Sequence, residues 1–148
     1  MHAVQQILNT VQAVLAAGGT PAGTRVFLDR IDPVQAAELP AILIDEADSG
    51  EQSQTEDLDG TERRELRITI VCLLAATTDA VAIARTFGLA IEKLIASNAG
   101  LKALSTNPPR LLSSRLLQNG EGDRLFAGRE HIWLVDYCVF PAAPDVIL

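Results

Sequence analysis

The residues with the most obvious chemistry in this chain are seven carboxylic acids gathered within residues 45–60. They are Asp45, Glu46, Asp48, Glu51, Glu56, Asp57 and Asp59, and no Lys or Arg lies among them. Carboxylates in a fixed, partly buried site can act as acid and base or bind a cation. Here they alternate with Ser, Gln and Gly, a composition that predicts a mobile acidic loop over 45–60 in which burial cannot tune a carboxyl pKa.

The same segment matches a calcium-binding loop only in part. Asp45, Gly50 and Glu56 fall at its first, sixth and twelfth positions, but the third position is Ala47, which has no ligand oxygen. The flanking segments also have the pattern of strands and not of helices. A solvated run of charge is the better interpretation, so we expect no metal and no cofactor.

No other motif in the sequence predicts a reaction. There is no Gly-x-Ser-x-Gly, and Gly18-Gly19 follows a helical segment, which is typical of a helix end and not of a phosphate-binding loop. His2 and His131 have no patterned Cys, His or carboxylate near them. The sequence therefore predicts a protein that is not an enzyme, with no catalytic residue.

The acidic segment accounts for the whole net charge of −7. Removing its seven acids from the 19 in the chain leaves twelve, which equals the 12 Lys and Arg residues. An acidic chain does not hold nucleic acid by neutralising phosphates. The apolar run at 70–76 is too short to cross a membrane and the N-terminus lacks a signal peptide, so a cytosolic origin is expected by default.

Hydrophobic periodicity predicts two helices and five strands in one domain, 1–148. Apolar residues recur at helical spacing over Ala3–Ala17 and again in a segment that ends near Asn98. Strands are expected over residues 25–29, 41–44, 61–75, 111–118 and 130–140, followed by an extended tail at 141–148. Runs of strands divided by a helix, with a hairpin on each side, predict an α+β fold. We expect a mainly antiparallel sheet of four to five strands with both helices packed on one face.

Two of these strands are apolar on both faces. In the strand over 61–75, Leu66, Ile68 and Ile70 alternate with polar residues, but Val71 and Leu73 make its second half apolar on both sides. The final strand has the same character around Trp133 and Tyr137. Because such strands need cover on both faces, we expect a subunit interface on the face without helices, anchored by whichever aromatic points outward. A hydrophobic content of 48% agrees with surface that a partner covers.

Arg63, Arg67 and Arg115 define a candidate basic strip on the same exposed face. Ordinary cross-strand pairing with Glu65 and its neighbours is one interpretation. Contact with the acidic segment of a neighbouring subunit is the other.

Cys72 and Cys138 both lie within apolar runs. Two reduced thiols used as small hydrophobic residues are favoured, and a disulfide remains an alternative if their strands are neighbours.

The order of these elements resembles the tail terminator family of long-tailed bacteriophages. The matching segments run from Val4-Gln-Gln-Ile-Leu-Asn-Thr-Val through Thr24-Arg-Val-Phe-Leu, Glu38-Leu-Pro-Ala-Ile-Leu-Ile and Arg64-Glu-Leu-Arg-Ile-Thr-Ile-Val to the closing strand with Trp133 and Tyr137. The resemblance covers nearly the whole chain, and it lies in the sequence of elements more than in any one motif.

The resemblance implies a small virion subunit, made in the cytoplasm of the bacterial host, that caps the tail tube as a homo-oligomeric ring, usually a hexamer. It also implies an end to tail elongation and a docking surface for the head connector or neck protein. DNA would pass through the lumen without specific binding, and no membrane is involved. A head-completion or neck subunit is the nearest alternative, and a small ligand-binding or enzymatic α+β domain is the alternative from another class.

Overall fold

The computed structural model describes residues 1–56, 59–75, 78–121 and 124–148, and only the backbone for 55–56, 119–121 and 124–125. The helices are α1 (Ala3–Ala17), the short 3-10 helix η1 (Ala36–Glu38), α2 (Ala80–Ser97) and α3 (Ala99–Leu104). The strands are β1 (Val26–Leu28), β2 (Ala41–Glu56), β3 (Glu62–Ala75), β4 (Arg110–Glu121) and β5 (Arg124–Val139). The short helix α3 was not predicted; it lies between the helical segment expected to end near Asn98 and the strand expected over 111–118.

In the described part of the chain, the strands form one sheet in the order β1-β2-β3-β5-β4. The pairs β2–β3, β3–β5 and β5–β4 are antiparallel, which confirms the predicted α+β class with its mainly antiparallel sheet. The expected hairpin at the start of the sheet is wrong, because β1 runs parallel to β2. Residues 29–40 form a connection long enough to return the chain to the starting end of the sheet, which a parallel pair requires.

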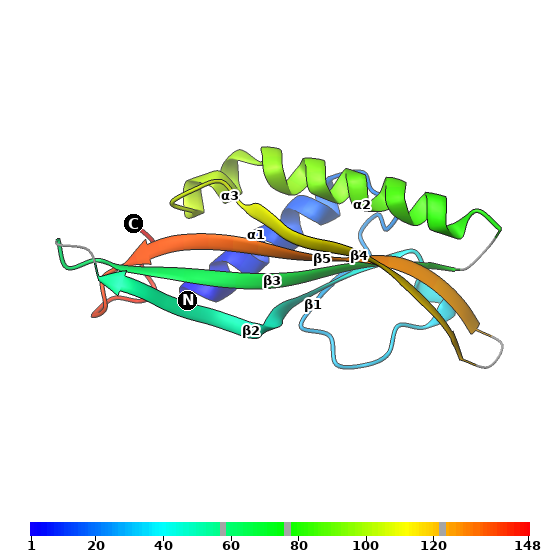
Figure 1. Cartoon of the computed structure of the whole chain (residues 1–148), viewed down its shortest axis with the longest axis horizontal. Coiled ribbons are helices and arrows are strands. Elements are labelled where there is room, and N and C mark those ends of the chain that lie inside the picture. The colour runs from blue at the N-terminus through cyan, green and yellow to red at the C-terminus, as the bar shows by residue number, and fades with distance from the viewer. Residues whose placement is uncertain (57–58, 76–77, 122–123) are drawn as a thin grey trace.

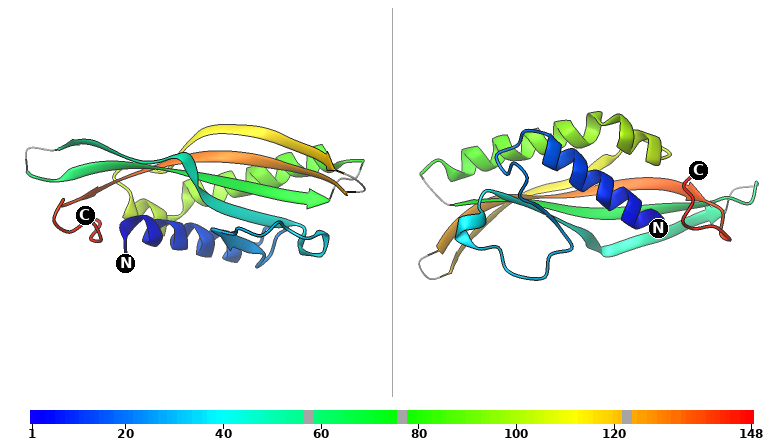
Figure 2. Two further views of the ribbon diagram at one scale, coloured as in Figure 1. Left: turned by 90° about the horizontal axis from the view of Figure 1, so that it is seen from below. Right: turned by 180° about the vertical axis from the view of Figure 1, so that it is seen from behind.

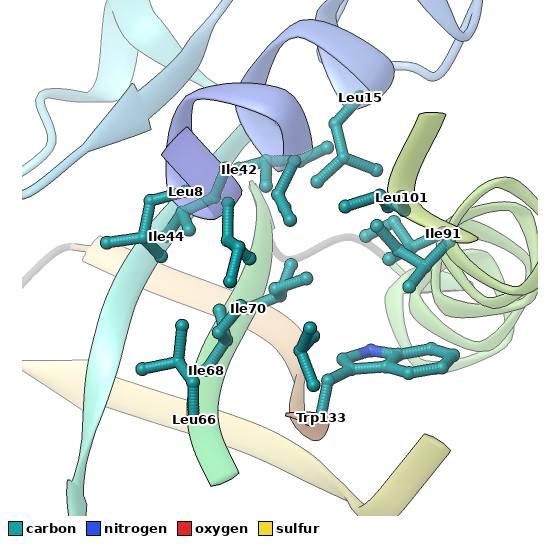
Figure 3. Packing of buried hydrophobic residues seen from close by; sticks show 14 of the residues in the cluster. Leu8, Leu15, Ile42, Ile44, Leu66, Ile68, Ile70, Ile91, Leu101 and Trp133 are labelled. Carbon is teal, nitrogen blue, oxygen red and sulfur yellow. The ribbon is translucent and has the colours of Figure 1, made fainter. Parts of the chain in front are cut away.

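Helices α1 and α2 pack on the same face of this sheet, with α1 lying across the strands in the view from behind (Figure 2). The inward residues of β3 are Leu66, Ile68 and Ile70, followed by Cys72, and each is at most 1% exposed. They form one cluster with Ile7 and Val11 of α1 and with Phe87 and Ile91 of α2, as expected if both helices pack on one face. Figure 3 shows Ile68, Ile70 and Ile91 in this core.

The C-terminal tail is not extended as expected but folds back onto the domain. Phe140 forms an isolated β-bridge with Ala143, and the Leu148 amide donates a 3.0 Å hydrogen bond to the Cys138 carbonyl. The Gln6 side chain of α1 donates to the Asp145 carbonyl at 2.7 Å, and Ile147 packs against the core. The tail therefore joins the end of β5 to the start of α1.

Cys72 and Cys138 are both free thiols. The side chain of Cys72 faces the helices, whereas Cys138 lies opposite Arg63 on the other face of the sheet. Burial raises the pKa of the Cys72 thiol to about 11, so it is a protonated, hydrophobic filler at neutral pH.

One polar residue, His131 of β5, lies within the layer between the sheet and α2. It is 1% exposed, and neither ring nitrogen has a hydrogen-bond partner among the described residues. Gly88 lets α2 approach this closely, since a Cβ there would lie 3.0 Å from Arg129 Cδ and 3.2 Å from His131 Nε2. Burial lowers the pKa of His131, and the positive charge of Arg129 lowers it further. Glu92, which has a carboxylate oxygen 3.8 Å from Nε2, raises the pKa and partly offsets these effects.

Replacing Ile70 by Ala should lower the free energy of unfolding by about 2–5 kcal/mol, because it leaves a cavity in the centre of the core. Ile70 is 1% exposed and belongs to the cluster formed by α1, α2 and β3. Denaturant unfolding followed by circular dichroism measures the change. A loss below 1 kcal/mol would contradict the central position of this side chain.

The free energy of unfolding should also fall as the pH drops below about 6.5, because the unfolded chain then takes up a proton at residue 131 that the folded chain excludes. The stabilisation is complete above the unfolded pKa, and it decreases with pH until the lowered pKa of folded His131 is reached. His131→Leu should flatten this dependence between about pH 6.5 and 5, measured by denaturant unfolding across that range. An unchanged slope in the variant would show that another group is responsible.

Candidate assembly interface

The face of the sheet opposite the helices carries the strongest candidate for function, and we call it the open face. Figure 1 shows β2, β3 and β5 in front with α1 behind them, and no helix crosses on the near side. The β3 side chains that alternate with the buried ones are Arg63, Glu65, Arg67, Thr69, Val71 and Leu73. Their partners on β5 are Cys138, Asp136, Leu134, Ile132, Glu130 and Gly128.

One half of the open face is largely apolar, although it also contains the ion pair between Arg115 and Glu130. Leu43, Val71, Leu73, Leu117 and Ile132 form this apolar patch, and all five are half-buried within the single chain. Gly128 lies between Leu73 and Leu117, and Leu73 packs so close that a Cβ on Gly128 would lie 3.0 Å from its Cδ2. The patch therefore spans four strands. The row through Gly128 has no charged side chain, whereas in the next row Glu130 lies opposite Val71.

The other half of the open face is an ion-pair network. Asp136 accepts hydrogen bonds from Arg63 and, through its two oxygens, from the backbone and side-chain amides of Asn107. Burial raises the pKa of Asp136, but these hydrogen bonds outweigh the effect, and the pKa lies below its usual value. The network fixes the segment before β4 against β5.

Two arginines in this half each have a side-chain nitrogen without a hydrogen-bond partner among the described residues. Arg63 Nε and Arg67 Nη1 are buried, and neither has a hydrogen-bond partner among the described residues. Arg67 approaches Glu65 at 3.8 Å, which leaves that contact at the outer limit of an ion pair. Buried donors of this kind are normally satisfied in a complete structure.

Four of the six predicted interface residues lie on the open face. Val71, Leu73, Arg63 and Arg67 are all there and half-buried.

The two aromatic anchors were predicted wrongly. Trp133 and Tyr137 point toward the helices and are 3% and 0% exposed (Figure 3 shows Trp133). They share the alternation of Val135 and Val139, so the outward positions of β5 belong to Ile132 and Leu134.

The prediction of a loop over residues 45–60 is wrong for residues 45–56. These residues continue strand β2, and their pairing with β3 extends to Glu56 opposite Glu62. Irregularities in the register between Glu46 and Glu51 and between Ser53 and Glu56 interrupt the pairing, and Gly50 has a φ of 57°. A β-bulge accommodates extra residues in one strand while the pairing continues beyond it. Gly50 can adopt its positive φ because glycine has no Cβ.

The acids of this segment have different surroundings. Glu51 accepts hydrogen bonds from Arg64, at 3.1 Å, and from the buried hydroxyl of Tyr137. Asp59 accepts from the amide and hydroxyl of Thr61, which lowers its pKa. Glu51 and Asp59 are therefore part of the hydrogen-bonding network of the fold.

Three acids of the segment, Asp45, Glu46 and Asp48, are exposed around the first bulge. They line one side of a hollow in the open face whose other side includes Arg115 and Glu130. Burial raises the pKa of Asp45, and the nearby Asp29 adds to this. The side chain of Glu56 and all of Asp57 lie outside the described residues.

No group of three or more His, Cys, Asp or Glu residues is arranged to hold a metal ion within the described ranges. In the same ranges, no helix has the length and apolar character needed to cross a membrane.

No protein-family model and no curated protein matches this chain. Among solved structures, it is similar to a chain from the virion of a native gene transfer agent particle, with 15% sequence identity and a TM-score of 0.48. The alignment covers 90% of this chain and 90% of that chain. At this level of identity the likeness concerns the fold alone.

Replacing Leu73 by Lys should leave the fold intact and weaken self-association at least about tenfold, because a charge would be buried within the apolar patch. Leu73 is half-buried on β3 between Ala41 of β2 and Gly128 of β5, so no carboxylate lies directly opposite it. Sedimentation velocity over a concentration series measures the change. Val146→Lys, which alters a Val 51% exposed in the tail, is the matched control. Equal association of the two variants would place the interface elsewhere.

Proposed function

We propose that this chain is a structural subunit of a phage-like virion that caps the tail tube as a ring, ends tail elongation and provides a surface for head docking. The observation that carries the proposal is the open face. The helices cover one side of the sheet only, while the other side presents an apolar patch and buried arginine donors. An obligate subunit uses such a surface in the way that a single domain uses its core.

The order of elements supports the tail terminator role in particular. The opening amphipathic helix, the strand preceded by Leu39-Pro40, the long strand β3, helix α2 and the closing strand β5 follow the order in which the sequence resembles that family. The expected partners are further copies of the chain, the tail tube protein and a connector or neck protein.

The exposed acids suit contact at the rim of such a ring. Asp45, Glu46 and Asp48 project at a bulged strand and can pair with basic residues of a neighbour. If they faced a lumen instead, they would repel the phosphates of passing DNA. We favour the contact role, because Arg110 and Arg115 at the other edge of the sheet supply an opposite charge.

A head-completion or neck subunit is the second candidate, since it would use the same ring-forming surface. A small ligand-binding or enzymatic domain is the candidate from a different class. It would be monomeric, which distinguishes it from both virion roles.

The purified protein should form rings visible by negative-stain microscopy, with a mass near six times 15.8 kDa by light scattering. It should bind purified tail tubes at one end and stop their growth in a tube polymerisation assay. Binding to tail-less heads without binding to tubes would favour the neck role. A monomer of 15.8 kDa at all concentrations, without binding to either structure, would contradict both virion roles.

A further inference from the structure

We propose that copies of this chain join edge to edge, with β4 of one copy pairing along the outer edge of β2 in the next, to make one sheet that continues across subunits. The inference deepens the proposed ring, because it names the strands that join neighbours, and it rests on the assembly part of that proposal. The observation behind it is that β4 at one side of the sheet, and β2 beyond the short strand β1 at the other, each have an unpaired edge in the described chain.

Strand β4 is the open edge on one side. It comes last in the strand order and pairs only with β5 among the described residues. Residues 110–120 contain no Pro, Lys, Asp or Glu, and Leu112 and Leu116 are 39% and 38% exposed. Monomeric proteins usually protect an exposed edge with charges, prolines or a covering element. Here the edge has no proline and its charged residues are Arg110 and Arg115, so a strand that places carboxylates opposite these arginines can pair with it.

Strand β2 is the open edge on the other side. The three residues of β1 cover only Ile42–Ile44, and the Asp29 amide adds one more hydrogen bond to the Ile44 carbonyl. From Asp45 onward, β2 has β3 as its only strand partner within the described part of the chain. The bulge at residues 47–50 divides this edge into two short segments on which a further strand can pair.

The two edges carry opposite charge. The described side chains of β4 contribute Arg110 and Arg115, with the Arg115 side chain 68% exposed, whereas the β2 edge contributes Asp45, Glu46 and Asp48. Joining two β4 edges would set arginine against arginine, and joining two β2 edges would set acid against acid. Charge therefore favours β4 against β2, a head-to-tail contact of the kind that closes into a ring.

Strand direction and side-chain orientation agree with this pairing. Following the antiparallel pairs from β2 through β3 and β5 shows that β4 runs opposite to β2, so adjacent copies in the same orientation form an antiparallel pair. Asp45 lies opposite Thr69, and Arg115 lies opposite Glu130, so both side chains are on the open face. In a continuous sheet they lie on the same side, where they can form a cross-strand ion pair.

A charge reversal tests the pairing. Arg115→Glu and Asp45→Arg should each weaken self-association at least about tenfold, because each puts like charges together at the junction. The double variant, D45R with R115E, should recover most of the affinity, since a head-to-tail junction then contains the same pair reversed. Arg85→Glu, at an exposed position of α2, is the control for the change of charge and should associate like the wild type.

Sedimentation velocity gives the association constants, and circular dichroism with thermal unfolding checks the fold of each variant. Because Arg115 also pairs with Glu130, Arg115→Ser replaces the reversal if R115E is unstable, and D45R alone should still weaken association. If the wild type assembles but the reversals leave its affinity unchanged, or the double variant is no better than the singles, edge pairing is wrong while the ring proposal stands. If the wild type stays monomeric at every concentration, both are wrong.

Discussion

The antiparallel pairing of β3 with β5 is the constraint on which the rest of the molecule depends. Its unbroken register from Glu62 and Val139 to Ala75 and Phe126 fixes which side chains of both strands share a face. One face then presents a continuous apolar surface, which α1 and α2 cover. The other face consists of the side chains at the alternate positions of the same strands, which in this chain are arginines, acids and aliphatic residues. A slip by one residue would exchange the two faces, so core and candidate interface are determined together.

Much of this arrangement could be predicted from sequence because the strong signals are local. The alternation from Leu66 to Cys72 gave the correct inward face of β3, and helical spacing gave both ends of α1 and the end of α2 closely. The orientation of Trp133 and Tyr137 was missed, because β5 is apolar on both sides. The polar residues Glu130 and Asp136 share an alternation with Ile132 and Leu134, and that signal would have pointed the aromatics inward.

The acidic segment shows why composition alone was insufficient. Its Ser, Gln, Gly and acidic residues predicted a loop, yet β3 extends far enough to provide a hydrogen-bonding partner for residues up to Glu56. Arg64 and the hydroxyl of Tyr137 then hold Glu51, and both contacts arise from residues distant in sequence. Tertiary pairing overrides local propensity here, as it often does for strands. Hydrophobic periodicity also could not predict that β1 and β2 are parallel, because their relative direction depends on the path of residues 29–40.

We propose that further copies of this chain complete its sheet at the edges of β4 and β2. Hydrogen–deuterium exchange of the wild-type protein over a concentration series tests it most directly, because it reports each backbone amide in the unmodified chain. Our account predicts that protection of amides in β4 around residues 111–118, and in β2 around residues 45–46, rises with concentration, while the exposed face of α2 is unaffected. Assembly without any change in protection at β4 and β2, or protection confined to α2, would contradict it.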